Sequence, residues 1–173
     1  MKTYFKLIGL FAFLSLIFTF ATCKYSTKDT APIPAEIKTF RVNYFENKAR
    51  YVNPQITPKL TEALKQKIIS QTRLRQTNTD DAHYDISGYL SDYSVTTSGV
   101  ANQTAGTNRL NVTFHLIFRN TLDPDPKKSF EADLTTNYDF SAQLSLQQAE
   151  AELSDKIIKN VTDAIFNRIF SNW

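Results

Sequence analysis

The sequence predicts one α+β domain in which two helices pack on one face of an antiparallel or mixed sheet of about four strands. Three observations lead to this fold class. Four segments alternate apolar and polar residues, two others repeat apolar residues every three or four positions, and their order is strand, helix, strand, strand, strand, helix. This order contains no long series of parallel crossovers, which disfavours a nucleotide-binding α/β fold.

The first 22 residues have the pattern of a secretory signal peptide. Lys2 and Lys6 supply a short basic region, and residues 7–20 form an uncharged, mainly apolar run. A membrane-spanning helix needs about 20 apolar residues, and this shorter run ends at small residues followed by the polar residues 24–29. We therefore expect residues 1–22 to be cleaved.

Cys23 is the sole cysteine of the chain and lies directly where the signal would be cut. The preceding residues Phe20-Ala21-Thr22 resemble a bacterial lipobox, in which the cysteine thiol is diacylated before cleavage. Lipidation of Cys23 is the expectation, because two or more acyl chains, at about 0.8 kcal/mol per buried CH₂, anchor a protein stably. Thr22 is a looser fit to the lipobox, so cleavage by ordinary signal peptidase is an alternative, as is a chance position of Cys23 in a discarded segment.

The mature chain has the size and charge of one neutral globular domain. Removal of 22 residues from the 173 leaves 151, which is close to the commonest domain size. Two of the 20 basic residues lie in the signal, so 18 face 17 acidic ones, and this balance disfavours general nucleic-acid binding. Residues 23–35 are expected to form a lipidated N-terminus and tether, and residues 36–173 the domain.

The first two elements of this domain are a strand and a helix. Residues 37–45 alternate, with Phe40, Val42 and Tyr44 on one face. Thr57 and Pro58 are typical of a helix start, with threonine as the N-cap and proline at the first helical position. The helix is expected to run to about Thr72, with a buried stripe formed by Leu60, Ala63, Leu64 and Ile68.

Three strands are predicted next, over residues 83–95, 109–120 and 128–140. The middle strand has the clearest alternation, and the third repeats it. The turn 123–126, Asp-Pro-Asp-Pro, joins these two strands, because proline cannot donate a hydrogen bond within a sheet. The residues expected on the core face are Leu110, Val112, Phe114, Leu116 and Phe118, then Phe130, Ala132, Leu134, Thr136 and Tyr138.

A long helix closes the chain. Ser145 and Gln148 have the spacing of a capping box, in which each side chain bonds the backbone of the other residue. A stripe of Leu146, Ala149, Leu153, Ile157, Val161, Ala164 and Ile165 follows. Further apolar residues, Phe166, Ile169, Phe170 and Trp173, indicate a helix that is covered on two sides or that supports a partner, and core packing is the commoner cause.

The residue inventory offers little for catalysis, so we expect no enzyme activity, no cofactor and no metal site. The chain has two histidines, His83 and His115, and neither has a second ligand at metal-binding spacing. A nucleophile elbow, an HExxH helix, a phosphate-binding glycine loop and a CxxC pair are all missing from the sequence. Pairs of aspartates occur only beside turn residues, where aspartate is common for backbone reasons.

One long connection and several basic residues are candidates for lipid binding. Residues 96–108 are uncharged and join two strands that a short hairpin could have linked, and loops of this length are often functional or disordered. Arg109, Lys127 and Lys128 could meet the phosphates of an anionic lipid. The alternative for each of them is an ordinary solvated surface residue.

A series of short segments over the whole chain resembles the LptE family of lipopolysaccharide-assembly lipoproteins, in the form found in Bacteroidetes. The segments, in order, are Ile37-Lys38-Thr39-Phe40, Tyr44-Phe45-Glu46-Asn47, Val52-Asn53-Pro54, Thr61-Glu62-Ala63-Leu64, Gly88-Tyr89, Asn108-Arg109-Leu110, Phe118-Arg119-Asn120-Thr121, Tyr138-Asp139-Phe140, Ile165-Phe166-Asn167 and Trp173. The resemblance implies a non-enzymatic outer-membrane lipoprotein on the periplasmic side. It also implies a sheet with two helices packed on it, and of the family's functional residues it carries over only the anchor, Cys23.

The resemblance further implies two partners, the β-barrel LptD and lipopolysaccharide. The protein would lie partly inside the barrel, with a polar strand face and loops against the barrel wall, while basic and hydroxyl groups compete for lipid A phosphates. Two other readings stay open. The chain could be a periplasmic scaffold or regulator lipoprotein of another cell-envelope complex, or, with less support from the residues, a periplasmic hydrolase.

Overall fold

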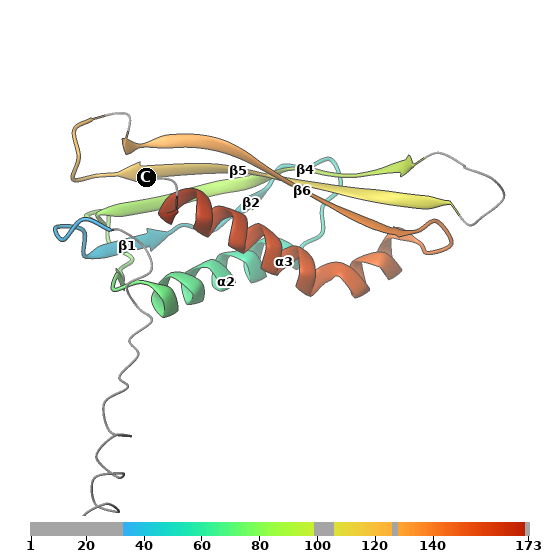
Figure 1. Cartoon of the computed structure of the whole chain (residues 1–173), viewed down its shortest axis with the longest axis horizontal. Helices are drawn as coiled ribbons and strands as arrows, with labels where there is room; N and C mark the ends of the chain where they lie inside the picture. The colour runs from blue at the N-terminus through green and yellow to red at the C-terminus, as the bar shows by residue number, and fades with distance from the viewer. Residues whose placement is uncertain (1–32, 99–105, 126–127, 172–173) are drawn as a thin grey trace, which may run out of the picture.

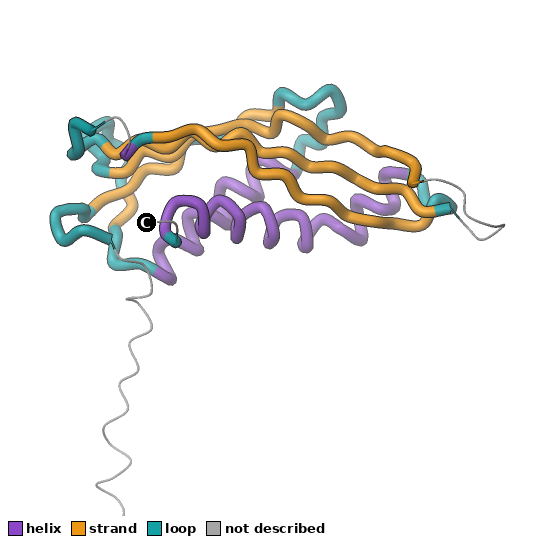
Figure 2. The backbone as a smooth tube through the Cα atoms, turned by 45° about the horizontal axis from the view of Figure 1, so that its top comes forward, coloured by secondary structure: helices purple, strands orange, loops and turns teal. Residues whose placement is uncertain are grey.

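The computed structural model describes residues 33–98, 106–125 and 128–171, which form two layers. Both helices lie on the same side of one twisted sheet (Figures 1 and 2). The elements are β1 (Thr39–Val42), β2 (Glu46–Asn47), α2 (Ile56–Gln71), β3 (Arg75–Gln76), β4 (Tyr84–Ser98), β5 (Thr107–Asn120), β6 (Phe130–Ser141) and α3 (Leu146–Phe170). The predicted α+β class with two helices on one face is confirmed.

The sheet is mixed and has six strands in the order β3-β1-β4-β5-β6, with β2 also paired to β4. The three long strands β4, β5 and β6 form an antiparallel meander, whereas β1 runs parallel to both β3 and β4. The sequence predicts about four strands. The additional two, β2 and β3, have two residues each and are too short to carry an alternating pattern.

The first predicted strand is wrong in its second half. Tyr44 was expected on the same face as Phe40 and Val42, which are buried, but it is 65% exposed, and Phe45 is buried instead. The register explains the change: β1 leaves β4 at the pair Val42↔Ile86 and β2 rejoins it at Glu46↔Tyr89. The four steps from Val42 to Glu46 lie beside only three steps of β4, from Ile86 to Tyr89. The extra residue reverses the alternation, so the residues after it face the opposite side of the sheet.

The start of α2 also differs from the prediction. The helix begins at Ile56 with Gln55 as its N-cap, and that cap makes no side-chain hydrogen bond. Thr57 is buried as the second helical residue, and its carbonyl oxygen accepts a bond from the Thr61 hydroxyl at 2.8 Å. Pro58 still falls in the first turn, where the missing N–H has no helical partner to lose.

The closing helix follows the prediction closely. The Ser145 Oγ accepts a hydrogen bond from the Gln148 backbone N–H at 3.3 Å, and the Ser145 N–H donates to the Gln148 side chain at 3.0 Å. Phe166, Ile169 and Phe170 are buried, because α3 packs against both α2 and the sheet. The core-packing interpretation of these residues is confirmed, while Trp173 lies outside the described residues.

The core lies between β5 and the helices. The five predicted inward residues of β5 are all at most 2% exposed: Leu110, Val112, Phe114, Leu116 and Phe118. Gly88 on β4 faces this row closely. A Cβ atom at Gly88 would lie 2.3 Å from the His115 carbonyl oxygen and 2.7 Å from the Phe114 ring, so this position has no room for a side chain.

Replacing Gly88 by alanine is therefore expected to destabilise the fold by about 2 kcal/mol or more, since overpacking here displaces backbone as well as a ring. Gly106→Ala is the matched control, because its Cβ would make an ordinary 3.6 Å contact with Ala142. Urea denaturation of both variants measures the difference. Equal unfolding midpoints would contradict the packing described for β4 and β5.

Candidate functional site

The sheet face opposite the helices carries no covering element among the described residues (Figure 2). We call this surface the open face. Its residues alternate with the buried ones of β4, β5 and β6, and nearly all are polar. They include Asp85, Ser87, Tyr89, Arg109, Asn111, Thr113, His115, Glu131, Asp133, Thr135, Asn137 and Asp139.

The centre of the open face is a cluster around His115. Its Nδ1 lies 2.7 Å from an Asp133 oxygen and its Nε2 lies 3.2 Å from a Glu131 oxygen. The Tyr89 ring stacks on the imidazole at 4.9 Å between centroids, and the Lys48 ammonium lies 4.2 Å from the centre of the Tyr89 ring. Three strands and Lys48, the residue that follows β2, thus contribute to one connected polar group.

Ion pairs extend this arrangement in both directions along the sheet. Arg41 of β1 donates to Asp85 at 2.9 Å and also contacts Asp80. At the other end, Arg109 makes two hydrogen bonds to Asp139, of 2.7 and 3.1 Å, and these hold the pKa of Asp139 below its usual value. Most charges of the open face are therefore paired within it, which leaves a polar surface suited to hydrogen bonding.

The structure does not bring the predicted lipid-binding residues together. Arg109 lies near the start of β5, whereas Lys128 lies just before the pair Phe118↔Phe130 at its other end. Nine strand steps from Arg109 to Phe118, at about 3.4 Å each, separate the two positions by about 30 Å. Lys127 and Cys23 lie outside the described residues. One phosphate group cannot contact both Arg109 and Lys128.

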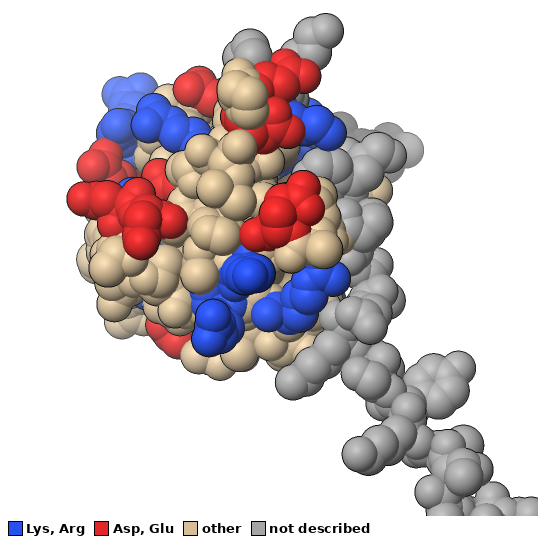
Figure 3. All heavy atoms as spheres, turned by 90° about the vertical axis from the view of Figure 1, so that its left-hand side faces the viewer, with Lys and Arg blue, Asp and Glu red and all other residues tan. Residues whose placement is uncertain are grey.

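Lys128 instead neighbours the first described residues of the chain. Pro34, Glu36 and Ile37 line a small pocket of about 110 Å³ together with residues of the β5–β6 connection, including Lys128. Arg73 donates to the carbonyl oxygens of Ile33 and Pro34 and so holds the first described residues against the domain. We call this end of the sheet the entry end. Figure 3 looks onto it and shows basic and acidic side chains side by side around an uncharged centre.

Sequence reasoning placed His115 on the polar face of its strand but did not find its partners. The β5–β6 register pairs His115 directly with Asp133, and counting back from the Asp-Pro-Asp-Pro turn is the signal that could have found this pair. His83 has a backbone role, since its Nδ1 accepts the Lys38 N–H at 3.1 Å. In the described part of the chain no three His, Cys, Asp or Glu side chains are arranged so that they could hold a metal ion, and no helix is long and apolar enough to cross a membrane.

Comparison with known proteins gives one family and several similar folds. The family model described as "LptE: Lipopolysaccharide-assembly" matches residues 37–169. A minor lipoprotein from Acinetobacter baumannii superposes with a TM-score of 0.51 at 17% identity, covering 79% of this chain and 92% of that one, which shows a shared fold.

Two further solved structures are similar to this chain. PelC from Paraburkholderia phytofirmans has a TM-score of 0.45 at 13% identity, covering 82% of this chain and 95% of that one. The rare lipoprotein B from Shewanella oneidensis has a TM-score of 0.36 at 10% identity, covering 75% and 92%. Among curated proteins, none matches the sequence.

The His115 cluster predicts a pH dependence of stability. The hydrogen bond to Asp133 raises the pKa of His115 above its ordinary value of 6.5; desolvation opposes this rise and Glu131 adds to it. A pKa raised by folding stabilises the fold fully below the unfolded-state value, and this contribution is lost as pH rises through the folded-state value. His115→Gln should therefore lower the unfolding midpoint more near pH 6 than near pH 9.

NMR titration of the His115 ring provides the direct readout. Asp133→Asn should lower the pKa of His115, because it removes the partner with the largest effect. A titration curve for His115 that is the same in the wild type and in Asp133→Asn would contradict the contact across β5 and β6.

Proposed function

Since the chain belongs to the LptE family of lipopolysaccharide-assembly lipoproteins, we propose that it acts at the outer membrane as the lipid-anchored, non-enzymatic partner of an LptD-like β-barrel and assists lipopolysaccharide transport. The family match confirms the resemblance drawn from the sequence. Partner, membrane and anchor are the finer parts of this proposal, and each can be tested separately.

The open face is the observation that supports a barrel partner best. The lumen of an outer-membrane barrel is polar, and three long strands here present a polar surface to such a wall. A charge buried without a partner destabilises a complex strongly. Arg41, Arg109 and His115 each have a carboxylate partner on the open face, so these three would enter a lumen already paired.

The described chain begins at Ile33, at the entry end. Cys23 lies ten positions before Ile33, and ten residue steps span at most about 35 Å. A lipidated Cys23 would therefore keep the entry end, with Lys128, close to the membrane. Arg109 lies at the opposite end of the sheet, farther from the anchor.

Lipopolysaccharide phosphates would accordingly meet two separate basic positions on this protein. Lys127 and Lys128 would bind them beside the membrane, and Arg109 would bind them at the far end of the sheet. Arg109 donates to Asp139 through Nε and Nη2, so a phosphate could take its remaining N–H donors or replace Asp139, and the side chain is half-exposed.

A pull-down of the full-length protein from detergent-solubilised envelopes tests the barrel partnership. We expect an LptD-like barrel to co-elute at comparable amount, and mass spectrometry to find acyl chains on Cys23. Recovery of other envelope proteins in place of a barrel would instead favour a scaffold or regulator of a different complex. An unmodified Cys23 would remove the anchor from the proposal.

Asn137→Arg tests the open face within the same experiment, because it adds an unpaired charge to an exposed position of β6. It should reduce recovery of the barrel at least about tenfold, the effect of losing about 1.4 kcal/mol of binding free energy. Gln66→Arg makes the same charge change on the exposed side of α2 and should leave recovery unchanged. Equal recovery of the barrel with both variants would contradict the proposal that the open face contacts the barrel.

Lipopolysaccharide binding by the full-length protein tests the two basic positions. Arg109→Ala and the double change Lys127→Ala with Lys128→Ala should each weaken binding, and the triple variant should weaken it further, because the sites are about 30 Å apart and act independently. Binding that is unchanged in the triple variant would remove all three residues from the mechanism.

A further inference from the structure

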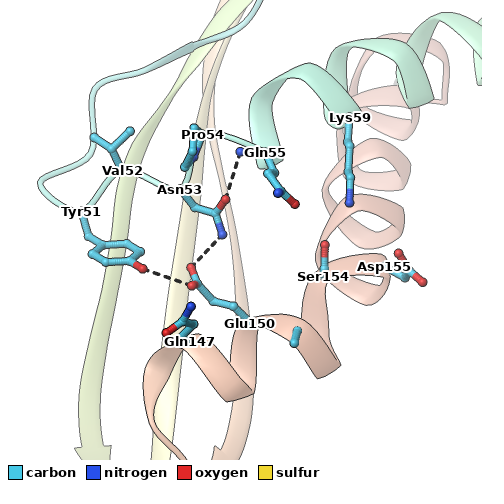
Figure 4. A pocket seen from close by; sticks show the side chains of 11 residues that line it. Tyr51, Val52, Asn53, Pro54, Gln55, Lys59, Gln147, Glu150, Ser154 and Asp155 are labelled. Atoms are coloured by element: carbon cyan, nitrogen blue, oxygen red, sulfur yellow. Dashed lines mark hydrogen bonds between the residues drawn. The ribbon is translucent and has the colours of Figure 1, made fainter.

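A pocket of about 700 Å³ opens between the start of α2 and the first turns of α3. Figure 4 shows its two sides. Tyr51, Asn53 and Glu150 lie together on one side, and Lys59 and Asp155 lie on the other. It is separate from the open face, since its residues come from the two helices and from the segment that precedes α2.

Glu150 is the unusual group in this pocket. It is only 8% exposed, and its two carboxylate oxygens accept hydrogen bonds from the Tyr51 hydroxyl at 3.1 Å and from the Asn53 side-chain amide at 3.0 Å. Both donors are neutral. Among the described residues, no Lys, Arg or His side chain forms an ion pair with Glu150 within 4.0 Å. The carboxylate is thus buried in the wall of a pocket without a cation.

The geometry leaves room for such a cation. A carboxylate offers about four lone-pair positions; the Tyr51 hydroxyl and the Asn53 amide occupy two of them, and the Tyr93 hydroxyl is a further neighbour of Glu150. The remaining lone pairs point in a fixed direction. The backbone of Glu150 belongs to α3, and Tyr51 and Asn53, from the segment before α2, hold its carboxylate in place by hydrogen bonds. A guanidinium or ammonium group in the pocket could therefore donate to a carboxylate that is already oriented.

Two tyrosines add an aromatic surface next to the carboxylate. The Tyr51 ring stacks on Tyr93 with centroids 5.7 Å apart and planes 20° from parallel. Burial and the adjacent Glu150 raise the pKa of both phenols, which therefore stay neutral at physiological pH. Tyr51 is 41% exposed, so part of its surface is open. The face of a neutral aromatic ring attracts cations, and it attracts guanidinium groups most often.

The charge of the lining also favours a cation over an anion. The charged residues that line the pocket are two carboxylates, Glu150 and Asp155, and one ammonium group, that of Lys59. Glu150 is the buried member, whereas Asp155 and Lys59 are exposed to solvent, which screens them. A phosphate group in this pocket would meet the buried carboxylate directly.

We propose that this pocket binds a guanidinium or primary ammonium group, with the Glu150 carboxylate as its ion-pair partner and the Tyr51 ring as the surface beside it. The site goes beyond the proposed function, because the proposed contacts with lipopolysaccharide phosphates and a barrel wall lie elsewhere on the molecule. The cation could belong to a basic side chain of a polypeptide or to a free small amine, and both sources present the same chemistry to Glu150.

Two-dimensional NMR of the ¹⁵N-labelled full-length protein in detergent micelles tests the site, with the Asn53 side-chain amide as reporter. The probes are N-acetylarginine N-methylamide, its neutral isostere N-acetylcitrulline N-methylamide, and putrescine. We expect saturable shifts with at least one cationic probe and none with the citrulline compound. A response to the arginine probe alone assigns the site to a basic side chain, and a response to putrescine alone assigns it to a free amine.

Variants locate the binding within the pocket. Glu150→Gln should weaken the cation at least about tenfold, because it replaces a charged hydrogen bond by a neutral one. Asp155→Asn makes the same change on the exposed side and should weaken it less than about threefold. Tyr51→Phe removes the hydroxyl that bonds Glu150 but keeps the ring and the carboxylate. It should therefore still bind the cationic probe, and it can be measured if Glu150→Gln fails to fold.

The proposal is overturned if neither cationic probe shifts the Asn53 signal, or if the citrulline compound binds as well as the arginine compound. Equal affinity of the wild type and a folded Glu150→Gln variant overturns it as well. None of these outcomes bears on the barrel pull-down, so the pocket and the proposed function can fail independently.

Discussion

The alternation of β5 is the constraint on which the rest of the structure depends. Its inward residues from Leu110 to Phe118 are all nearly inaccessible, and both helices pack on the side to which they point. Because the side-chain period of a strand is two, this one row determines which residues of β5 face outward. A slip of one residue would place five large apolar side chains in water and the polar set in the core, so the register of the meander is strongly specified.

That register in turn determines the chemistry of the open face. Pairing Leu110 with Tyr138 in the core aligns Arg109 with Asp139 and His115 with Asp133 on the other side. Cross-strand partners of opposite charge add modestly to stability, while like charges opposite each other would destabilise the sheet. Opposite charges on the open face are thus paired as a consequence of the same register that builds the core.

Local patterns in the sequence predicted the parts of the fold that depend on neighbours along the chain. The β5 alternation and the Ser145/Gln148 capping box are of this kind. Patterns failed where distant contacts decide the outcome: Tyr44 faces solvent because the chain gains one residue on β4, a parallel pairing that short-range alternation does not encode. For the same reason the sequence could not predict the pocket, since 97 residues separate Asn53 from Glu150.

The pocket differs from the open face in its electrostatics: charges on the open face are paired with opposite charges, whereas the Glu150 carboxylate has only neutral hydrogen-bond donors. A buried carboxylate without a cation costs folding free energy, which neutral donors offset only in part. A cation that binds the native state and not the unfolded chain would remove that cost and raise the stability of the fold by mass action. The hydrogen bonds of Glu150 join the segment before α2 to the first turns of α3. Occupancy of the pocket would therefore stabilise the junction between the segment before α2 and the start of α3.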